Sequence, residues 1–353
     1  MKSPTIREVA KEAGVSPATV SRYLNKSIEL PQGTSARIDL AVEQLKYRPN
    51  LLAKRLSRGT SETIGLVTPD IANPFFAVLA AAIEDEARKF DYSVLFSSTS
   101  GDPRREIVNL ERLDDRHVDG LIILTNRADD GTLKTYLDGR KDVILLDEDV
   151  PGARLPKIFV ENEPGAYLAT RRLIEAGHEC IAHIGGPAGL FSARERFAGY
   201  RRAMHEAKLQ IDKSLVRFGA YERSAGLAAI RALMGSVPPP TAIFTGSDYI
   251  AVGVLQGLRE LALHVPADVS LTSFDDMPFS DLLDPPITTV RQPIEELGRL
   301  GVRTLLAQLK GKATSSMQRL ATRLIERQSV AAPATTDRVR GARAKRASRA
   351  RDV

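Results

Sequence analysis

Apolar residues near the start of the chain recur at helical spacing in two short runs. Val9 and Ala13 lie four residues apart and share one side of a helix, which Gly14 ends. Val20 and Leu24 repeat the same spacing after this break. The pattern predicts two short helices joined by a tight turn, each with one buried side.

Polar residues mark the starts of both predicted helices. Thr5 and Glu8 are spaced as a capping box, and Ser16 can cap the second helix, with Pro17 at its first position. The outward side of the second helix carries Pro17, Ala18, Ser21, Arg22 and Asn25. Because these side chains are mostly small or polar, such a helix can enter a DNA major groove without being held away from the bases.

A third helix is predicted from Thr34 to Leu45, with Ile38 on its inner side, which completes a three-helix head. Pro31 and Gly33 stand where a capping residue would stabilise the first turn. We therefore expect a weak start to this helix but no change of fold.

Beyond residue 62, short apolar runs alternate with amphipathic stretches, the rhythm of parallel sheets covered by helices. The first set comprises strands at 64–67, 94–96, 120–124 and 143–146 and helices at 75–90 and 104–116. The second set comprises strands at 181–184, 216–218, 242–245 and 269–274 and helices at 163–176, 192–207, 223–234 and 248–261. We expect two α/β lobes, with residues 293–310 returning to the first.

The composition is that of a globular protein with several cores. The chain has 353 residues, of which 43% are hydrophobic and 5% aromatic, enough for two or three domains. No apolar run approaches the roughly 18 residues that span a bilayer, and the first residues lack the apolar stretch of a signal peptide. Cys180 is the single cysteine, and the five histidines lack the spacing of metal ligands. These features predict a soluble cytoplasmic protein without a metal or cofactor.

The net charge of +6 is unevenly distributed along the chain. Residues 1–60 hold 11 Lys and Arg against 5 Asp and Glu, residues 61–330 hold 32 against 37, and residues 331–353 hold 7 against 2. Attraction to a polyanion therefore belongs to the two ends. The tail has few apolar residues and is expected to be disordered; it either adds nonspecific attraction to DNA or has no role.

Residues 5–22 read Thr-Ile-x-x-Val-Ala-x-x-Ala-Gly-Val-Ser-x-x-Thr-Val-Ser-Arg, and Leu-Lys-Tyr-Arg-Pro-Asn follows at 45–50. These motifs resemble those of the LacI/GalR family of bacterial transcription repressors, and the resemblance covers about residues 4–330. It implies an all-α helix-turn-helix head at 1–48, a hinge helix or linker at 49–61, a two-lobed periplasmic-binding-protein-like α/β domain with parallel sheets at 62–330, and a tail at 331–353.

The resemblance also implies a function. A repressor of this family would bind a pseudo-palindromic operator in double-stranded DNA as a homodimer, and a small molecule between the lobes would change its DNA affinity. A sugar or sugar derivative is the first candidate effector, and a nucleoside is the second. A solute-binding or sensor protein with no DNA role is the alternative. An enzyme is not expected, because the chain lacks a nucleophile elbow, a phosphate-binding loop and a dinucleotide glycine pattern.

Within the head, the family's base-reading positions fall on Pro17, Ala18 and Arg22. Arg22 can donate two hydrogen bonds to a guanine, and Ala18 suits a thymine methyl group. The further candidate DNA contacts are Thr5, Ser16, Thr19, Ser21, Asn25, Tyr47, Asn50, Ala53 and Leu56. Leu56 matches the leucine with which the family's hinge helix wedges into the minor groove. The alternative for this segment is a flexible tether whose leucines pack on the lobes.

Polar and aromatic residues at the predicted strand ends form the candidate effector site, because ligands of open α/β sheets bind there. Arg196 and Asp275 match the family's ligand-binding arginine and acid, and facing each other they suit a neutral molecule with adjacent hydroxyls. A purely structural ion pair is the alternative. The other candidates are Asn73, Phe75, Phe76, Asp147, Ser192, Tyr221, Ser247 and Asp248, with one of the two phenylalanines expected to be core.

The assignment of Arg22 to base reading can be tested by substitution. Arg22→Ala should remove about 1 to 3 kcal/mol of preference at one guanine in each half-site, because a bidentate contact to one base is lost. Competition binding with single-base operator variants measures this preference. An equal loss of affinity for all DNA sequences would contradict the role.

Overall fold

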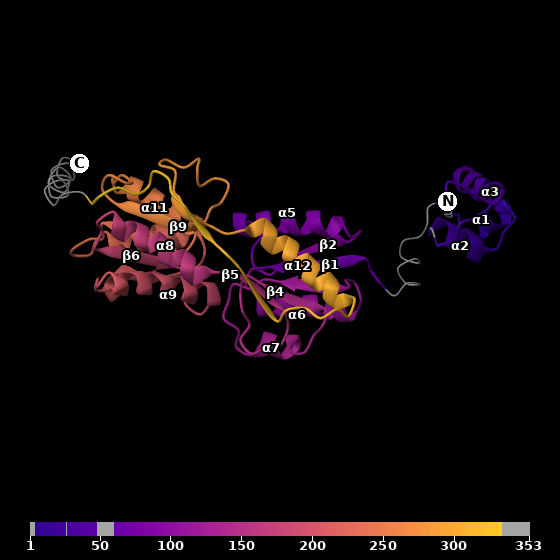
Figure 1. Cartoon of the computed structure of the whole chain (residues 1–353), viewed down its shortest axis with the longest axis horizontal. Coiled ribbons are helices and arrows are strands. Elements are labelled where there is room, and N and C mark those ends of the chain that lie inside the picture. Colours follow the sequence, from indigo (N-terminus) through magenta and orange to yellow (C-terminus); the bar gives the residue numbers. More distant parts are fainter. Residues whose placement is uncertain (1–3, 26, 48–59, 334–353) are drawn as a thin grey trace. The chain divides into compact units, whose positions relative to one another are not determined.

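The structure, a computed structural model, describes residues 4–25, 27–47 and 60–333. They fall into two compact units, one within Met1–Ser61 and one within Glu62–Val353, which we call the head and the body (Figure 1). Within these described ranges, no helix is long and apolar enough to cross a membrane.

The first two helices of the head, α1 (Ile6–Ala13) and α2 (Pro17–Leu24), begin and end as the sequence predicts. The backbone amide and the hydroxyl of Thr5 both donate to the carboxylate of Glu8, which confirms the capping box. Gly14 ends α1 with a φ of 65°, a left-handed conformation that glycine adopts without strain. The amide of Thr19 donates to the Ser16 hydroxyl at 3.1 Å and so caps α2.

The third helix, α3 (Gln32–Gln44), begins two residues before the predicted start at Thr34. No side chain caps it; the Pro31 carbonyl accepts hydrogen bonds from the amides of Thr34 and Ser35 instead. Val9, Val20 and Ile38, one from each helix, are fully buried in a common core. The three helices are therefore held together by one small apolar cluster.

The body contains two six-stranded sheets, each at the centre of a lobe. The sheet of lobe 1 consists, in spatial order, of β11 (Met317–Leu320), β5 (Lys157–Val160), β4 (Val143–Leu146), β3 (Gly120–Ile123), β1 (Thr63–Thr68) and β2 (Ser93–Ser98). The sheet of lobe 2 consists of β12 (Arg323–Ile325), β10 (Thr288–Arg291), β9 (Ser270–Asp275), β8 (Ala242–Thr245), β6 (Ile181–Gly185) and β7 (Val216–Phe218). Neighbouring strands run parallel except β10 and β12, which are antiparallel.

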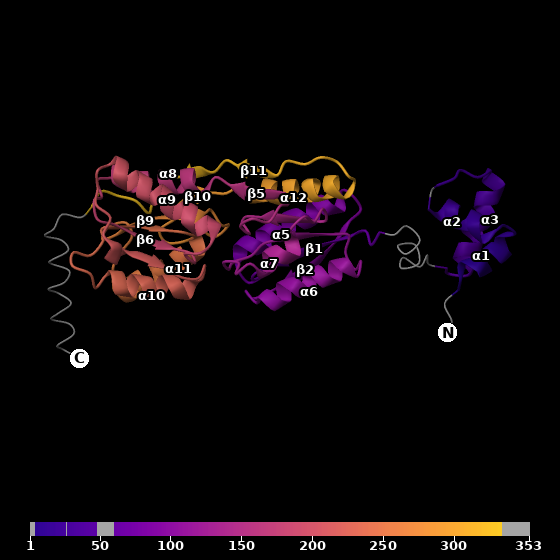
Figure 2. The ribbon, with the colours of Figure 1, turned by 90° about the horizontal axis from the view of Figure 1, so that it is seen from below.

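Helices cover both faces of each sheet. Those of lobe 1 are α5 (Pro74–Arg88), α6 (Pro103–Asp114), α7 (Thr132–Leu137) and α12 (Ile294–Leu309). Those of lobe 2 are α8 (Asn162–Glu175), α9 (Phe191–Glu206), α10 (Arg223–Leu233) and α11 (Asp248–Glu260), with a short 3₁₀ turn at Lys213–Leu215. Figure 2 shows α8 and α9 on one side of the second sheet and α10 and α11 on the other. The result is the two-lobed α/β architecture that the sequence predicted.

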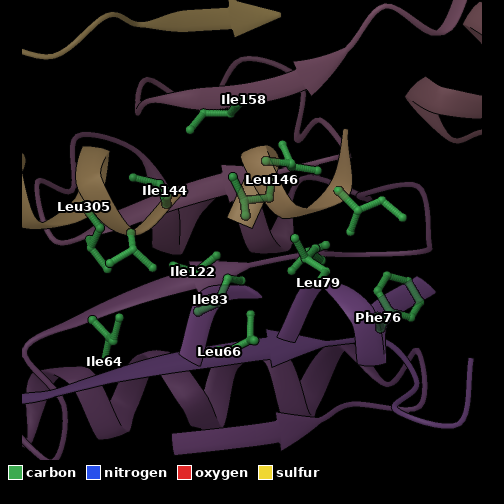
Figure 3. Close-up of a cluster of buried hydrophobic side chains, with 14 of the residues drawn as sticks. Ile64, Leu66, Phe76, Leu79, Ile83, Ile122, Ile144, Leu146, Ile158 and Leu305 are labelled. Atoms are coloured by element: carbon green, nitrogen blue, oxygen red, sulfur yellow. The ribbon is translucent and has the colours of Figure 1, made fainter. Parts of the chain in front are cut away.

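The central strands of lobe 1, β1, β3 and β4, are apolar on both faces because helices pack on both sides. Ile64 and Leu66 point into the core under α5 and α12, as do Ile144 and Leu146 (Figure 3). The residues between them in sequence, such as Leu145, enter a second cluster with α6 and α7. Successive strand residues thus serve two cores, which explains why these runs are continuously apolar rather than alternating.

The chain passes between the lobes three times, after β5, after β10 and between β11 and β12. The second passage delivers α12 to lobe 1, where Leu297 and Leu305 are fully buried, which confirms the predicted return of this segment. Figure 2 shows β11 beside β5. The sequence did not predict the strands β5, β10, β11 and β12 or the helix α7. These elements are short, and several of them are largely polar.

The end of lobe 2 extends further than the predicted boundary at residue 330. The carbonyl of Ala331 accepts hydrogen bonds from His178 at 2.9 Å and from Ser270 at 3.1 Å, and its amide donates to Ser270. Ala331, which the sequence placed at the start of the tail, is therefore attached to the lobe. The remainder of the tail from residue 334 lies outside the described residues.

The contact between α10 and α11 leaves no room for a side chain at Gly253. A Cβ at this position would lie 1.9 Å from the carbonyl oxygen of Arg223 and 2.8 Å from the amide nitrogen of Leu227. We expect Gly253→Ala to lower the free energy of unfolding of the body by about 1 to 3 kcal/mol or more, because the helices must separate. Urea unfolding followed by circular dichroism measures the change.

Gly33 in α3 provides the contrasting case, because no atom would lie within 4 Å of a Cβ there. Gly33→Ala should leave the stability of the head unchanged or raise it by up to about 1 kcal/mol, since alanine is the better helix former. Equal effects of both substitutions would contradict the close contact at Gly253.

Candidate functional site

The exposed side of α2 carries the candidate base-reading residues of the head. Pro17, Ala18 and Arg22 are exposed, whereas Val20 on the other side is fully buried. An anchored helix that presents an arginine beside small side chains has the form required to enter a major groove.

The other predicted DNA contacts differ in exposure. Thr5 and Ser16 are exposed, and Thr19, Ser21, Asn25 and Tyr47 are half-buried. The hydroxyls of Ser16 and Thr19 lie 2.8 Å apart, so both residues also stabilise the start of α2. The hinge candidates Asn50, Ala53 and Leu56 lie outside the described residues.

The body contains a cavity of about 150 Å³ that is lined by residues of both lobes. Nine of the ten predicted effector residues line it, namely Asn73, Phe75, Phe76, Asp147, Ser192, Arg196, Tyr221, Ser247 and Asp275. Most of them stand at the carboxyl ends of strands or in the first turn of the following helix, where ligands of α/β sheets bind. Most of the predicted residues, although spread over about two hundred positions of the sequence, therefore line one cavity.

Arg196 is the central polar residue of this cavity and is only 4% exposed. Its Nη1 lies 3.5 Å from Oδ1 of Asp275, which confirms that the two residues face each other. The same guanidinium donates to the side chain of Asn162 at 2.8 Å and to the carbonyl of Gly246 at 2.6 Å, and it lies 4.0 Å above the ring of Phe274. These contacts hold the arginine in one orientation.

Two buried acceptors in the cavity have no hydrogen-bond partner among the described residues. They are Oδ1 of Asp147 and Oε1 of Gln292. A buried acceptor without a partner destabilises the protein unless a water or ligand donates to it. Both residues are therefore positioned to accept hydrogen bonds from a polar ligand.

Aromatic side chains form the apolar part of the wall. The rings of Phe75 and Phe76 meet edge to face with centroids 5.3 Å apart, and both belong to the lobe 1 core as well as to the cavity. Asn73 caps α5 through its side-chain oxygen and donates from its nitrogen to the carbonyl of Tyr221 at 3.3 Å. This bond joins the two lobes at the edge of the cavity.

The carboxyl groups in the cavity are held away from water. Burial raises the pKa of Asp275 to about 8, although the nearby Arg196 opposes the shift. Burial also raises the pKa of Asp147, again opposed by Arg196. A neutral ligand that brings hydroxyl donors would satisfy these acids without adding charge.

Asp248 is the one predicted effector residue that does not line the cavity. Its carboxylate accepts from the amide of Met277 at 2.8 Å and from the hydroxyls of Ser280 and Thr289 at 2.5 and 2.7 Å. These bonds tie the start of α11 to the segment around β9 and β10. The sequence placed Asp248 at a strand end correctly, but its side chain turns away from the cavity.

The predicted effector set left out six lining residues, namely Asp70, Asn126, Pro187, Ala220, Glu222 and Gln292. Gln292 directly follows β10, which the sequence did not identify as a strand because its Thr-Thr-Val-Arg run is short and half polar. Asn126 follows β3 by three residues and could have been found by the strand-end argument.

The role of Asp248 in joining these segments can be tested by its removal. Asp248→Ala should lower the free energy of unfolding by about 1 to 3 kcal/mol or more, because buried donors lose their acceptor. Thermal unfolding measures this loss. Asp281→Ala, at an exposed position in the adjacent loop, should change stability by less than about 0.5 kcal/mol; similar losses in both variants would contradict the structural role of Asp248.

Comparison with family models gives two matches along the chain. Residues 5–50 match the model for bacterial regulatory proteins of the lacI family, and residues 170–330 match that for a periplasmic binding protein-like domain. The first match covers the helices of the head, and the second covers most of lobe 2 and part of the cavity.

Known proteins with similar sequences and structures extend over nearly the whole chain. The ribose operon repressor of Halalkalibacterium halodurans is 34% identical, with 92% of this chain and 96% of that protein covered. The HTH-type transcriptional repressor PurR of Haemophilus influenzae is 34% identical, with 87% and 92% covered. The crystal structure of the lac repressor dimer bound to operator and the anti-inducer ONPF shares 28% identity and a TM-score of 0.84, with 94% and 100% covered.

These similarities overturn the alternative of a sensor without a DNA role. They confirm the expected fold and the expected DNA-binding regulator of the LacI family with a periplasmic-binding-protein-like domain. The relatives are transcriptional repressors rather than enzymes. The chain belongs to the LacI family of bacterial regulatory proteins and is a DNA-binding transcriptional repressor with a small-molecule pocket in its body.

Proposed function

We propose that a monosaccharide bound in the body cavity controls how this repressor binds its operator, with D-ribose as the first candidate. The observation that carries the proposal is the set of polar groups in the cavity: Arg196 opposite Asp275, with unpartnered buried acceptors on Asp147 and Gln292. Adjacent hydroxyls of a sugar can both donate to such acceptors and accept from a guanidinium. A relative at 34% identity is named ribose operon repressor.

The size of the cavity favours a small ligand. Its volume of about 150 Å³ is below the roughly 300 to 1,000 Å³ of pockets that hold drug-sized molecules. A single sugar ring needs less space than a nucleoside, which carries a base in addition. A nucleoside or a purine base is the second candidate, because Phe75, Phe76 and Tyr221 offer aromatic surface and another relative is named PurR.

We further propose how the effector reaches the head. A ligand that contacts both lobes stabilises one arrangement of them, and the segment at 49–61 transmits the change to two heads on one pseudo-palindromic operator. In this proposal Pro17, Ala18 and Arg22 read bases, and Leu56 wedges into the minor groove. The residues that position the duplex are Thr5, Ser16, Thr19, Ser21, Asn25, Tyr47, Asn50 and Ala53. The chain would act in the cytoplasm, where the DNA is, and would catalyse no reaction.

Calorimetry of the full chain with D-ribose, D-glucose, adenosine and hypoxanthine tests the effector class. We expect D-ribose to bind and Arg196→Ala to weaken its binding at least about tenfold, because hydrogen bonds to a charged group contribute roughly 1.5 to 3 kcal/mol. Operator binding measured with and without the bound compound then gives the direction of control.

Arg201→Ala is the matched control, because Arg201 is on the same helix but is exposed and does not line the cavity. It should bind D-ribose as the unchanged chain does. Binding of adenosine or hypoxanthine but of neither sugar would replace the monosaccharide by the second candidate.

A further inference from the structure

Glu148 connects the two lobes at the edge of the cavity, although the sequence did not mark it as functional. It follows β4 in lobe 1 and is 3% exposed. Its carboxyl group accepts from the backbone amide of Ser192 at 3.2 Å and contacts the Ser192 hydroxyl. Ser192 stands in the first turn of α9 in lobe 2, so this contact exists only while the lobes are together.

The contact continues to a second residue of the cavity wall. The hydroxyl of Ser192 lies 2.9 Å from the phenol oxygen of Tyr221, and either atom can be the donor. Ser192 and Tyr221 both line the cavity. Glu148, Ser192 and Tyr221 therefore form a chain of hydrogen-bonding groups that ends at the cavity.

The surroundings of Glu148 disfavour a negative charge. The titratable groups that face it are its neighbour Asp147, Arg196 on α9 and the phenol of Tyr221, while Asp275 on β9 faces the same arginine. Three buried carboxyl groups thus share one guanidinium, which is already bonded to Asn162, Gly246 and Asp275. Burial, strengthened by the charge of Asp147, raises the pKa of Glu148 to about 8.

The protonation state of Glu148 determines whether Tyr221 can offer its hydroxyl hydrogen to a ligand. With an ionised carboxylate, Ser192 donates to Glu148 and the Tyr221 hydroxyl donates to Ser192, so the phenol hydrogen is used within the protein. With a neutral carboxylic acid, Glu148 donates to Ser192, Ser192 donates to Tyr221, and the phenol hydrogen is free to point into the cavity. Only the neutral state presents a donor.

We propose that Glu148 is a positioning residue of the effector pocket, that it works as a neutral acid, and that it directs the Ser192–Tyr221 chain so that Tyr221 donates a hydrogen bond to the effector while the lobes are closed. The inference rests on the proposed effector function of the cavity. It assigns to Tyr221 a preference for effectors with an acceptor oxygen at that point.

The sign of the pH dependence follows from this assignment. Binding needs the protonated acid, and at higher pH the proton must be taken up as the effector binds, so affinity falls as pH rises. The fall can reach about tenfold for each pH unit above the apparent pKa of Glu148 in the ligand-free chain. Glu148→Gln offers an amide donor to Ser192 at every pH and should remove the part of this dependence that comes from Glu148.

The experiment is calorimetry of the full chain with D-ribose from about pH 6 to about pH 9.5, in buffers of different ionisation enthalpy so that proton uptake is counted. We expect the ratio of the wild-type Kd to that of Glu148→Gln to rise with pH, and proton uptake on binding to be smaller in the variant. Glu148→Ala should bind more weakly than Glu148→Gln at all pH values. Identical pH profiles and identical proton uptake in the wild type and Glu148→Gln would overturn the proposal.

Glu195→Gln is the control variant. It removes a carboxylate at the lobe boundary but leaves the acids of the cavity unchanged. Glu195 on α9 pairs with Arg319 of β11 at 2.7 Å, across the lobes, and does not line the cavity. This variant should keep the wild-type dependence of the Kd on pH, whatever its effect on affinity. Loss of the pH dependence in Glu195→Gln would also overturn the proposal.

Thermal unfolding in the absence of ligand tests the protonation of Glu148 independently of which effector binds. The pKa of Glu148 is raised from 4.5 in the unfolded chain to about 8 in the folded state, so its stabilising contribution is full below about pH 4.5 and is lost as pH rises toward 8. The wild type should therefore lose stability relative to Glu148→Gln over this range even if D-ribose does not bind. A constant difference between the two would contradict the neutral acid, whereas absent ribose binding alone would contradict only the effector class.

Discussion

The buried guanidinium of Arg196 links the elements that form the cavity, and the other polar groups of the cavity are arranged around it. It bonds the side chain of Asn162 at the first passage between the lobes, the carbonyl of Gly246 after β8, and Asp275 at the end of β9. Asp275 in turn accepts from Gln292 at the second passage, at 2.6 Å. Removing the cation would leave buried carboxyl groups without a compensating positive charge, which is costly in a site of low polarity.

The lobes meet through both polar and apolar contacts. On the side of the chain passages, Arg319 pairs with Glu195 and the rings of Phe159 and Phe191 lie 4.6 Å apart. At the cavity, Asn73 reaches the Tyr221 carbonyl. Partly exposed ion pairs contribute little, about 0 to 1 kcal/mol each. A small ligand that bonds to both lobes can therefore change the balance between their arrangements.

The sequence predicted the head well because its signals are local. The Thr5–Glu8 capping box, the left-handed Gly14 and the Ser16 cap each depend on residues at most three positions apart. The central strands were also found, since their apolar runs face two cores. The edge strands β11 and β12 were missed because a polar strand on the rim of a sheet is stabilised by its neighbour rather than by its own pattern.

At the cavity, the sequence identified which residues stand at strand ends but not the direction in which their side chains point. The family resemblance identified Arg196 and Asp275 among the strand-end candidates, yet neither the resemblance nor the strand-end rule could show that Asp248 turns toward Met277 and Thr289. Glu148 was missed because its importance arises from Ser192, 44 residues away and in the other lobe. Contacts of this kind depend on tertiary packing, which no local pattern encodes.

The last elements of lobe 1 are synthesised only after most of lobe 2. Lobe 1 is complete only when α12 and β11 have joined strands that end at Val160, and Leu297 and Leu305 of α12 cover the apolar face of that sheet. At the usual speed of translation the ribosome needs on the order of ten seconds to synthesise the intervening segment. During that interval α5 alone covers this face, and the part beneath α12 remains exposed on the nascent chain.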